Sequence, residues 1–149
     1  MADFKTSAER QAHWDSIYEQ QEIQAMNWTQ EVAQPSLDLI EKAELTKEDR
    51  ILDVGAGASV LIKNLLDKGF QNLLATDISA RALEKNKARL GEQANQVQWV
   101  VDDVTNPQQL HELDHVTLWH DRGVFHYITN FRERLNYFSL MNRVVKEEG

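Results

Sequence analysis

The sequence predicts an α/β fold built on a parallel β-sheet. Four short apolar segments, expected to be strands at 51–54, 73–76, 97–101 and 116–120, alternate with stretches that carry helix start and stop signals. A strand–helix–strand unit returns the next strand in the same direction, so the alternation implies parallel strands with right-handed crossovers. No internal repeat or linker interrupts it, and we expect one domain. That domain, 1–149, would comprise N-terminal helices at 6–45 and an α/β core at 50–149.

Two helices are expected ahead of the sheet. Thr6 and Glu9 have the spacing of a capping box, which predicts a helix from Thr6 to about Gln20. Pro35 and Ser36 are typical first residues of a helix and predict that a second one begins there. Both helices lie outside the strand–helix alternation and form an N-terminal addition to the core.

Helices inside the core follow from similar signals. One is expected from about Ala58 to Lys68 and ends at Gly69, and another is capped by Ser79 and ends at Gly91. A short helix would follow Pro107, and a last one would run from the capping box of Asn130 and Glu133 to about Lys146. Its inner face is expected to carry Phe131, Leu135, Phe138 and Val145.

Composition limits the classes of partner. The chain has 24 acidic and 16 basic residues and a formal net charge of −8, which disfavours nucleic acid as a substrate. It contains no cysteine, and its five histidines form no recognisable ligand pattern, so no metal site is expected. No apolar run is long enough to cross a membrane and no secretory signal is recognisable, so a cytoplasmic location is the default expectation.

The strongest motif is ILDVGAGAS at 51–59. Gly55 and Gly57 allow a sharp turn after the first strand, and the following helix start offers free N–H groups to a carboxylate. A dinucleotide-binding turn would need a third glycine where Val60 stands. Asp53 lies in the strand before the turn, where it would suit a ligand with an ammonium and a sulfonium better than a pyrophosphate. The alternative is that the glycines serve turn geometry alone.

Acidic residues also end the next two strands. Asp77 could accept hydrogen bonds from both ribose hydroxyls, or it could simply cap the helix that starts near Ser79. Asp102 and Asp103 follow the third strand, where a carboxylate could contact an adenine amino group and Val104 the ring. Two adjacent acids are also common turn formers. All these carboxylates fall at the carboxyl ends of consecutive strands, where open α/β sheets bind ligands.

The segment WHDRGVFH at 119–126 crosses the end of the fourth strand. His120 or His126 could act as an acid or base, or could orient a nucleophile. Equally, Asp121 and Arg122 could form a structural ion pair and the histidines could be partly buried spacers. We treat all four residues as candidate catalytic residues.

At these motifs the chain resembles class I S-adenosylmethionine-dependent methyltransferases, specifically bacterial relatives of the lysine methyltransferases that modify citrate synthase and elongation factors. The matching segments are HWDSIY at 13–18, NW at 27–28, SLDLI at 36–40, DVGAGAS at 53–59, TDIS at 76–79, DVT at 103–105 and WHDRGVFHYIT at 119–129. A serine at position 59, in place of the family's third glycine, suits this subgroup.

The resemblance implies a Rossmann-like sheet with strand order 3-2-1-4 and S-adenosyl-L-methionine as cofactor. Asp53, Gly55 and Gly57 would hold its methionine part, Asp77 its ribose, and Asp103 with Val104 its adenine, while His120 and Asp121 would lie near the transferred methyl group. The complete set of expected cofactor-binding residues is Trp28, Asp53, Gly55, Ala56, Gly57, Ser59, Asp77, Ile78, Asp103, Val104 and His120.

The family continues into further strands beyond the point where this chain ends, so a sheet truncated before the C-terminal strands is expected. Its fourth strand would be an exposed edge, open to a second copy or another partner. The leading hypothesis is methyl transfer to a protein side chain, such as lysine, or to a small nucleophile. The alternative is a non-catalytic cofactor-binding or interaction module. A nicotinamide oxidoreductase is disfavoured by Asp53 and Val60.

Overall fold

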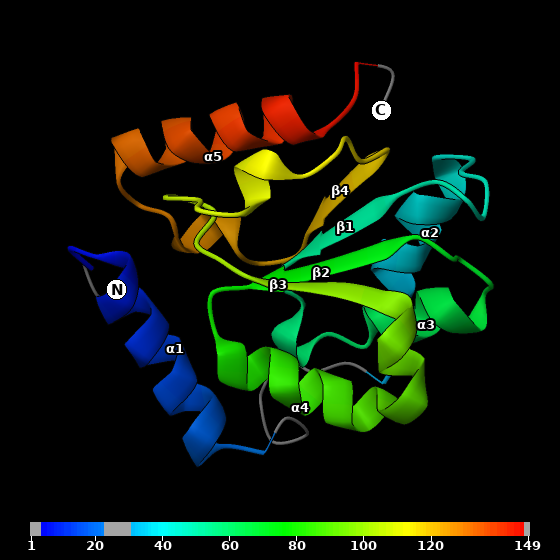
Figure 1. Ribbon diagram of the computed structural model, residues 1–149, viewed down its shortest axis with the longest axis horizontal. Coiled ribbons are helices and arrows are strands. Elements are labelled where there is room, and N and C mark those ends of the chain that lie inside the picture. Colours follow the sequence, from blue (N-terminus) through cyan, green and yellow to red (C-terminus); the bar gives the residue numbers. More distant parts are fainter. Residues whose placement is uncertain (1–3, 23–30, 148–149) are drawn as a thin grey trace.

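The computed structural model describes residues 4–22 and 31–147, and its helices and strands alternate as the sequence predicts (Figure 1). The α-helices are α1 (Ser7–Gln20), α2 (Gln34–Lys42), α3 (Leu61–Asp67), α4 (Ala80–Leu90) and α5 (Phe131–Val144). The strands are β1 (Ile51–Val54), β2 (Leu73–Asp77), β3 (Val97–Val101) and β4 (Leu118–Asp121). Short 3₁₀ turns are η2 (Ala56–Ala58), η3 (Gly91–Gln96), η4 (Leu110–Glu112) and η5 (Phe125–Tyr127).

The strands form one four-stranded sheet in the order β3-β2-β1-β4, and all pairs are parallel. This confirms the expected Rossmann-like fold and strand order. In the register between β1 and β4, Asp53 lies opposite His120. In the register between β1 and β2, Val54 lies opposite Thr76, and Asp77 follows at the strand end. The predicted site residues therefore meet at one edge of the sheet.

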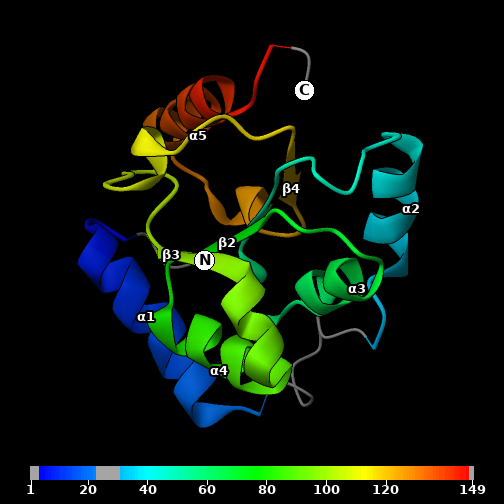
Figure 2. The same cartoon turned by 45° about the vertical axis from the view of Figure 1, so that its right-hand side comes forward.

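Two apolar clusters cover the two faces of the sheet. Side chains of α2, α3 and α4 pack on one face, where Ile51 and Leu73 are buried, and α5 packs on the other, over Leu52 and Leu74 (Figures 1 and 2). Alternate residues of a strand point to opposite faces, so Asp53 shares a face with Ile51 and with helix α2. None of the described helices is long and apolar enough to cross a bilayer.

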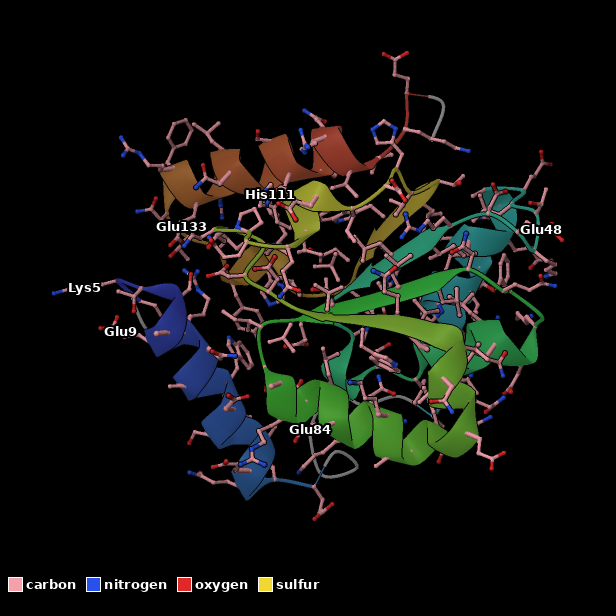
Figure 3. The ribbon with its side chains drawn as sticks, in the orientation of Figure 1. Lys5, Glu9, Glu48, Glu84, His111 and Glu133 are labelled. Carbon is pink, nitrogen blue, oxygen red and sulfur yellow. The ribbon has the colours of Figure 1, made fainter. Side chains whose placement is uncertain are left out.

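Helix α1 begins as the sequence predicts. The Thr6 hydroxyl accepts a hydrogen bond from the Glu9 backbone N–H at 3.1 Å. The Glu9 carboxylate accepts from the backbone N–H of Lys5 at 2.8 Å, one residue before the position that a capping box would use (Figure 3). On its inner side, α1 packs Tyr18 against Ala82 of α4.

The third helix starts later than the sequence predicts. After the 3₁₀ turn η2 the chain is extended at Ser59, whose hydroxyl accepts from the Leu61 N–H at 3.0 Å. Asn86 of α4 donates to the carbonyl of Ala56 at 2.7 Å and to that of Ser59 at 3.3 Å. This buried amide satisfies two carbonyls of the turn, so the turn does not need to continue as an α-helix.

The last helix turns a different face inward than the sequence predicts. Phe131, Leu135 and Phe138 are 75%, 52% and 43% exposed, while Tyr137 and Leu140 are buried with Val144. Of the four residues expected on the inner face, only Val145 packs against this cluster. Both stripes have helical spacing, so periodicity could not decide between them. The Tyr137 hydroxyl donates to Asp121 at 2.6 Å, and this buried polar contact fixes the helix rotation.

The fourth strand is also displaced. It covers Leu118–Asp121, whereas residues 116–120 were expected. Val116 instead forms an isolated parallel bridge with Val145, just after α5, and the carbonyl of Arg50 accepts from the N–H groups of Thr117 and Leu118. His120 lies in the strand as expected, and the shift adds Asp121, which pairs with Val54 at the end of β1.

Gly57 is expected to tolerate no side chain. An added Cβ would collide with the Cβ of Ala82 and lie 2.9 Å from Oδ2 of Asp77, so Gly57→Ala should lower the free energy of unfolding by about 1–3 kcal/mol. Gly69→Ala is the comparison variant: Gly69 has a φ of +89° and nothing near its Cβ position, so only backbone strain of about 1 kcal/mol is expected. Urea unfolding would measure both, and a smaller loss for Gly57→Ala would contradict the tight packing.

Asp102 is expected to stabilise the turn after β3. Its carboxylate accepts hydrogen bonds of 2.8–3.0 Å from the backbone N–H groups of Asp103, Gln108, Gln109 and Leu110. Asp102→Ala leaves these donors without acceptors and should cost about 2–3 kcal/mol. The control is Asp114→Ala, since the Asp114 side chain is fully exposed and should matter by less than about 0.5 kcal/mol. Equal unfolding free energies for the two variants would exclude this role.

Candidate functional site

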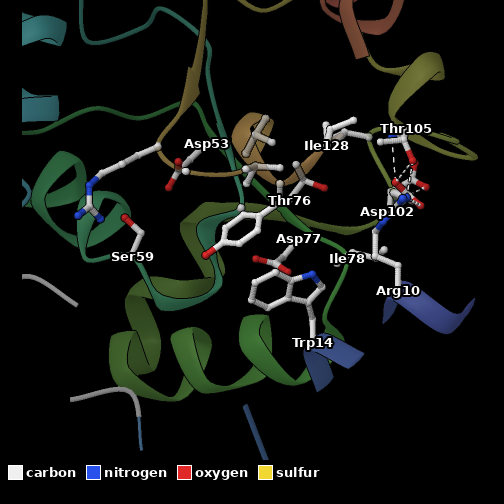
Figure 4. Close-up of a pocket in the computed structure, with 18 of the residues that line it drawn as sticks. Arg10, Trp14, Asp53, Ser59, Thr76, Asp77, Ile78, Asp102, Thr105 and Ile128 are labelled. Atoms are coloured by element: carbon white, nitrogen blue, oxygen red, sulfur yellow. Dashed lines mark hydrogen bonds and ion pairs between the residues drawn. The ribbon is translucent and has the colours of Figure 1, made fainter. Parts of the chain in front are cut away.

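A cavity of about 710 Å³ opens at the carboxyl ends of the strands, under helix α1. Pockets of this size hold small-molecule ligands and cofactors. Figure 4 shows Asp53 and Asp77 from neighbouring strands and Trp14 from α1 around this cavity. Most of the predicted site residues line it, namely Asp53, Gly55, Ser59, Asp77, Ile78, Asp103, Val104, His120, Arg122 and His126.

The glycine turn forms one side of the cavity. Gly55 adopts a left-handed conformation with a φ of 72°, and an added Cβ would collide with Val124, so only glycine fits there. Gly57 and Ala56 do not line the cavity. Gly57 lies against Ala82 and Asp77, so its glycine serves the packing of the turn on α4.

Asp53 places a buried carboxylate at the inner end of the cavity. It is 1% exposed, and Oδ1 lies 2.8 Å from Nδ1 of His120. Oδ2 is buried and has no hydrogen-bond partner among the described residues. Burial raises the pKa of Asp53, while the hydrogen bond and charge of His120 oppose that rise. A buried carboxylate oxygen without a donor favours a ligand that brings a cationic or N–H group.

His120 uses both ring nitrogens. Nδ1 contacts Asp53, and Nε2 lies 2.8 Å from the hydroxyl of Ser36 near the start of α2. Burial lowers the pKa of His120, but the hydrogen bond and charge of Asp53 outweigh burial and raise it above its ordinary value. Sequence reasoning identified Ser36 only as a helix-opening residue. Its place in the SLDLI segment was the available signal.

Asp77 lies at the end of β2 and faces the glycine turn. Oδ2 accepts from the Gly57 N–H at 3.1 Å and Oδ1 from the Ser79 N–H at 2.8 Å. Burial, with smaller effects from the charges of Asp53 and Asp15, raises the pKa of Asp77 to about 6, against the lowering by these N–H groups. Ser79 itself caps α4, because its hydroxyl accepts from the Ala82 N–H at 3.1 Å. Asp77 is therefore not the side-chain cap of that helix.

Asp103 lines the cavity, but other groups hold it in place. Oδ1 accepts from the N–H and hydroxyl of Thr105 at 2.9 and 2.7 Å, and Oδ2 accepts from Arg10 at 2.9 Å. Arg10 also donates to the Thr105 hydroxyl at 2.6 Å and to Glu133 at 2.8 Å. Sequence reasoning missed Arg10, because residues 93 positions apart share no local pattern.

The segment after β4 forms a further part of the cavity wall, next to the glycine turn. Asp121 accepts from the N–H groups of Val124 and Phe125 at 2.8 and 3.1 Å and from the Tyr137 hydroxyl, so it supports the turn η5. It does not line the cavity, whereas Arg122 and His126 do. Burial and the contact with Asp121 raise the pKa of Tyr137.

Aromatic rings from α1 and from the turn η5 meet in the lining of the cavity. The Trp14 indole and the Tyr127 ring meet edge to face with centroids 5.2 Å apart, and the His126 ring lies 4.2 Å from Tyr127. All three side chains line the cavity. Trp28, the other aromatic residue predicted to bind the cofactor, lies outside the described residues.

The cavity thus combines carboxylates from the ends of β1, β2 and the loop after β3 with an apolar and aromatic lining. This arrangement suits a ligand with a cationic end, a polar middle that can donate hydrogen bonds, and a flat ring. The apolar side chains Ile78 and Val104 lie beside the carboxylates in the lining and could contact such a ring.

Comparison with known proteins is consistent with this geometry. A family described as methyltransferase domain matches residues 51–149. The chain is 25% identical to EEF1A lysine methyltransferase 2 of Mus musculus over 151 residues, which cover 92% of this chain and 61% of that protein. The Homo sapiens protein of the same name is 24% identical, with 92% and 63% covered. The chain therefore spans about three fifths of the length of these relatives.

Solved structures share the fold. An S-adenosylmethionine-dependent methyltransferase from Clostridium acetobutylicum superposes with a TM-score of 0.67 at 22% identity, covering 97% of this chain and 55% of that one. Phosphoethanolamine N-methyltransferase 1 of Haemonchus contortus, solved with phosphoethanolamine and S-adenosylhomocysteine, gives 0.68 at 19% identity, with 94% and 30% covered.

The predicted resemblance is confirmed at the level of the family. The match covers the whole α/β core, which contains the glycine turn and the carboxylates that line the cavity. The chain belongs to the methyltransferase domain family, and it shares its fold with a solved S-adenosylmethionine-dependent methyltransferase.

Proposed function

We propose that the chain binds S-adenosyl-L-methionine in the cavity and transfers its methyl group to a protein side chain such as lysine, or to a small nucleophile. One observation carries the proposal: Asp53 lines the cavity, and its buried Oδ2 has no hydrogen-bond partner among the described residues. The ammonium of the cofactor's methionine part would supply the missing donor and charge. A nicotinamide dinucleotide would bring negative phosphates to this region instead.

The other cavity residues accommodate the rest of the cofactor. Asp77, whose two oxygens each have a lone pair left beside the backbone N–H groups, would accept the ribose hydroxyls. Ile78 and Val104 would pack on the adenine. Oδ2 of Asp103 also has a lone pair left beside Arg10 and could accept from the adenine amino group.

Methyl transfer makes few demands on acid–base chemistry. The cofactor supplies an activated methyl group, and the protein must place a neutral nucleophile in line with it and exclude water. His120 is engaged by Asp53 and Ser36, so we assign it to positioning. Arg122 and His126 line the cavity on the side of the turn after β4, and we assign them to orienting the acceptor.

The acceptor proposal rests on the relatives that act on lysine and on the character of the cavity. Trp14 and Tyr127 present aromatic edges and faces that favour an alkylammonium chain.

The free edge of β4, paired among the described residues only with β1, would take a further strand from a second copy or another partner. A reducing cytoplasm is the location that we propose for a chain without cysteine.

Cofactor binding should depend on an ionised Asp77. Protonation removes an acceptor for the ribose, so affinity should fall, by up to about tenfold per pH unit, as the pH drops below about 6. Calorimetry with 5′-methylthioadenosine, which carries the ribose but no amino acid, isolates this effect. Asp77→Asn should bind about tenfold or more weakly and lose the pH dependence.

The matched control for that variant is Glu84→Gln, since Glu84 is exposed on α4, where Figure 3 shows it at the surface. The control should bind as the unmodified protein does. An unchanged affinity of Asp77→Asn would remove the ribose assignment. Absence of binding by both S-adenosylmethionine and 5′-methylthioadenosine to the unmodified protein would reject the proposed function itself.

Methyl transfer is expected to depend on the side of the cavity that holds His126. With methyl-labelled S-adenosylmethionine and a cell extract, the unmodified protein should label a protein or small-molecule acceptor. Because His126 does not contact Asp53 or Asp77 in any described hydrogen bond, His126→Ala should reduce labelling about tenfold or more while cofactor affinity stays within about twofold. Cofactor binding without labelling of any acceptor would favour the alternative, a non-catalytic cofactor-binding module.

A further inference from the structure

Three polar side chains from three different elements form a continuous chain behind the inner end of the cavity. Ser36 of α2 contacts Nε2 of His120 on β4, and Nδ1 of the same ring contacts Oδ1 of Asp53 on β1, each at 2.8 Å. Ser36 is 5% and Asp53 1% exposed, and the His120 side chain is 12% exposed. The far end of the chain is the buried Oδ2 of Asp53, which has no partner among the described residues, and both Asp53 and His120 line the cavity.

This chain can hold two proton states without moving its heavy atoms. An ionised Asp53 only accepts, so Nδ1 of His120 carries a hydrogen toward it. Nε2 can then either accept from the Ser36 hydroxyl, when the ring is neutral, or donate to the Ser36 oxygen, when the ring is an imidazolium. Serine is the side chain that permits both, because its hydroxyl is donor and acceptor.

The charges around the chain favour the state with the additional proton when the cavity is empty. The titratable and charged groups that act on the pair are Asp121 and Arg122 at the end of β4 and Asp77 at the end of β2. Two of these three are acidic. The pKa values of both His120 and Asp53 are raised, which means that the pair as a unit retains a proton to a higher pH.

We infer that the Ser36–His120–Asp53 chain is a proton-linked receptor for a cationic group: a cation that docks on Oδ2 of Asp53 displaces a proton from the Asp53–His120 pair to solvent. No covalent bond is made or broken. The positive charge of the ligand arrives at Oδ2 of Asp53. At the same time the His120 ring, which contacts Oδ1, loses a proton, so the buried site does not carry two cations. Ser36 and His120 are positioning residues in this arrangement, and the inference rests on the proposed binding of S-adenosylmethionine.

Coupling of this kind makes the site selective. A ligand with an ammonium at the right place gains the full charge of Asp53, whereas a ligand without it leaves the proton on the pair and gains nothing from this end of the cavity. Binding of the ammonium-bearing ligand is therefore expected to tighten as the pH rises through the titration of the pair, by up to about tenfold per pH unit. The adenosine part alone should not show this component.

The test is calorimetric titration at a pH of about 6.5, where an α-amino group with an ordinary pKa of about 7.7–8.0 is still protonated. Titrations in two buffers with different ionisation enthalpies give the number of protons released. S-adenosylmethionine should release more protons than 5′-methylthioadenosine, and the difference should approach about one. The comparison cancels any proton exchange at Asp77, since both ligands carry the ribose.

Two variants assign the proton. His120→Asn keeps a donor toward Asp53 but lacks the titrating ring, so the difference in proton release between the two ligands, counted per mole of ligand bound, should vanish. Ser36→Ala removes the acceptor for the second ring proton, so the difference should shrink. A difference that persists in His120→Asn would overturn the inference.

The outcomes separate this inference from the proposed function. Equal proton release by the two ligands in the unmodified protein would reject the proton-linked receptor while leaving cofactor binding intact. Binding of neither ligand would reject the proposed function. The proton counts on the unmodified protein stand even if a variant fails to fold.

Discussion

The site depends on one constraint, the burial of the Asp53 carboxylate at the end of a central strand. Burying a charge costs free energy unless it is compensated, and here only one of its two oxygens has a partner among the described residues. The parallel register supplies that partner by placing His120 beside Asp53 on the adjacent strand. The glycine turn directly after β1 lines the cavity beside Asp53 through Gly55, and Oδ2 is left without a partner among the described residues. The position of Asp53, with one paired and one unpaired carboxylate oxygen, therefore follows from the strand pairing and the glycine turn together.

The surrounding structure maintains this arrangement by satisfying its own polar groups. Asp102 ties the turn after β3 to its backbone N–H groups, Asp121 does the same for the turn after β4, and Asn86 holds the glycine turn from α4. Each is a side chain on one element that fixes a loop next to the cavity. Loops without regular hydrogen bonding can then be held at defined positions around a ligand.

The sequence predicted the parallel sheet and the cavity carboxylates, because strands, turns and strand ends leave local signals, whereas the strand order was implied by the family resemblance. Asp53, Asp77 and Asp103 follow from their place at consecutive strand ends, and the structure brings all three to one cavity. The rotation of α5 could not be predicted, since its two apolar stripes have the same period and a single tyrosine hydroxyl decides between them. Ser36 and Arg10 were missed as site residues because their contacts join positions 84 and 93 residues apart, which no spacing rule reports.

Helix α1, which covers the cavity, is packed less extensively than the sheet on which the cavity lies. Among the described residues, neither of the two main apolar clusters includes a side chain of α1. This helix packs through Tyr18 on Ala82 of α4 and through Trp14 on Tyr127. Its main polar anchors are the Arg10 guanidinium, held by Asp103, Thr105 and Glu133, and Asp15, which accepts from the Ser79 hydroxyl. Detaching this helix would therefore disrupt neither apolar cluster. We expect α1 to be able to open as a local unit while the sheet beneath the cavity stays folded. Detachment of this one helix would then be enough for a ligand as large as a nucleoside to enter or leave the cavity.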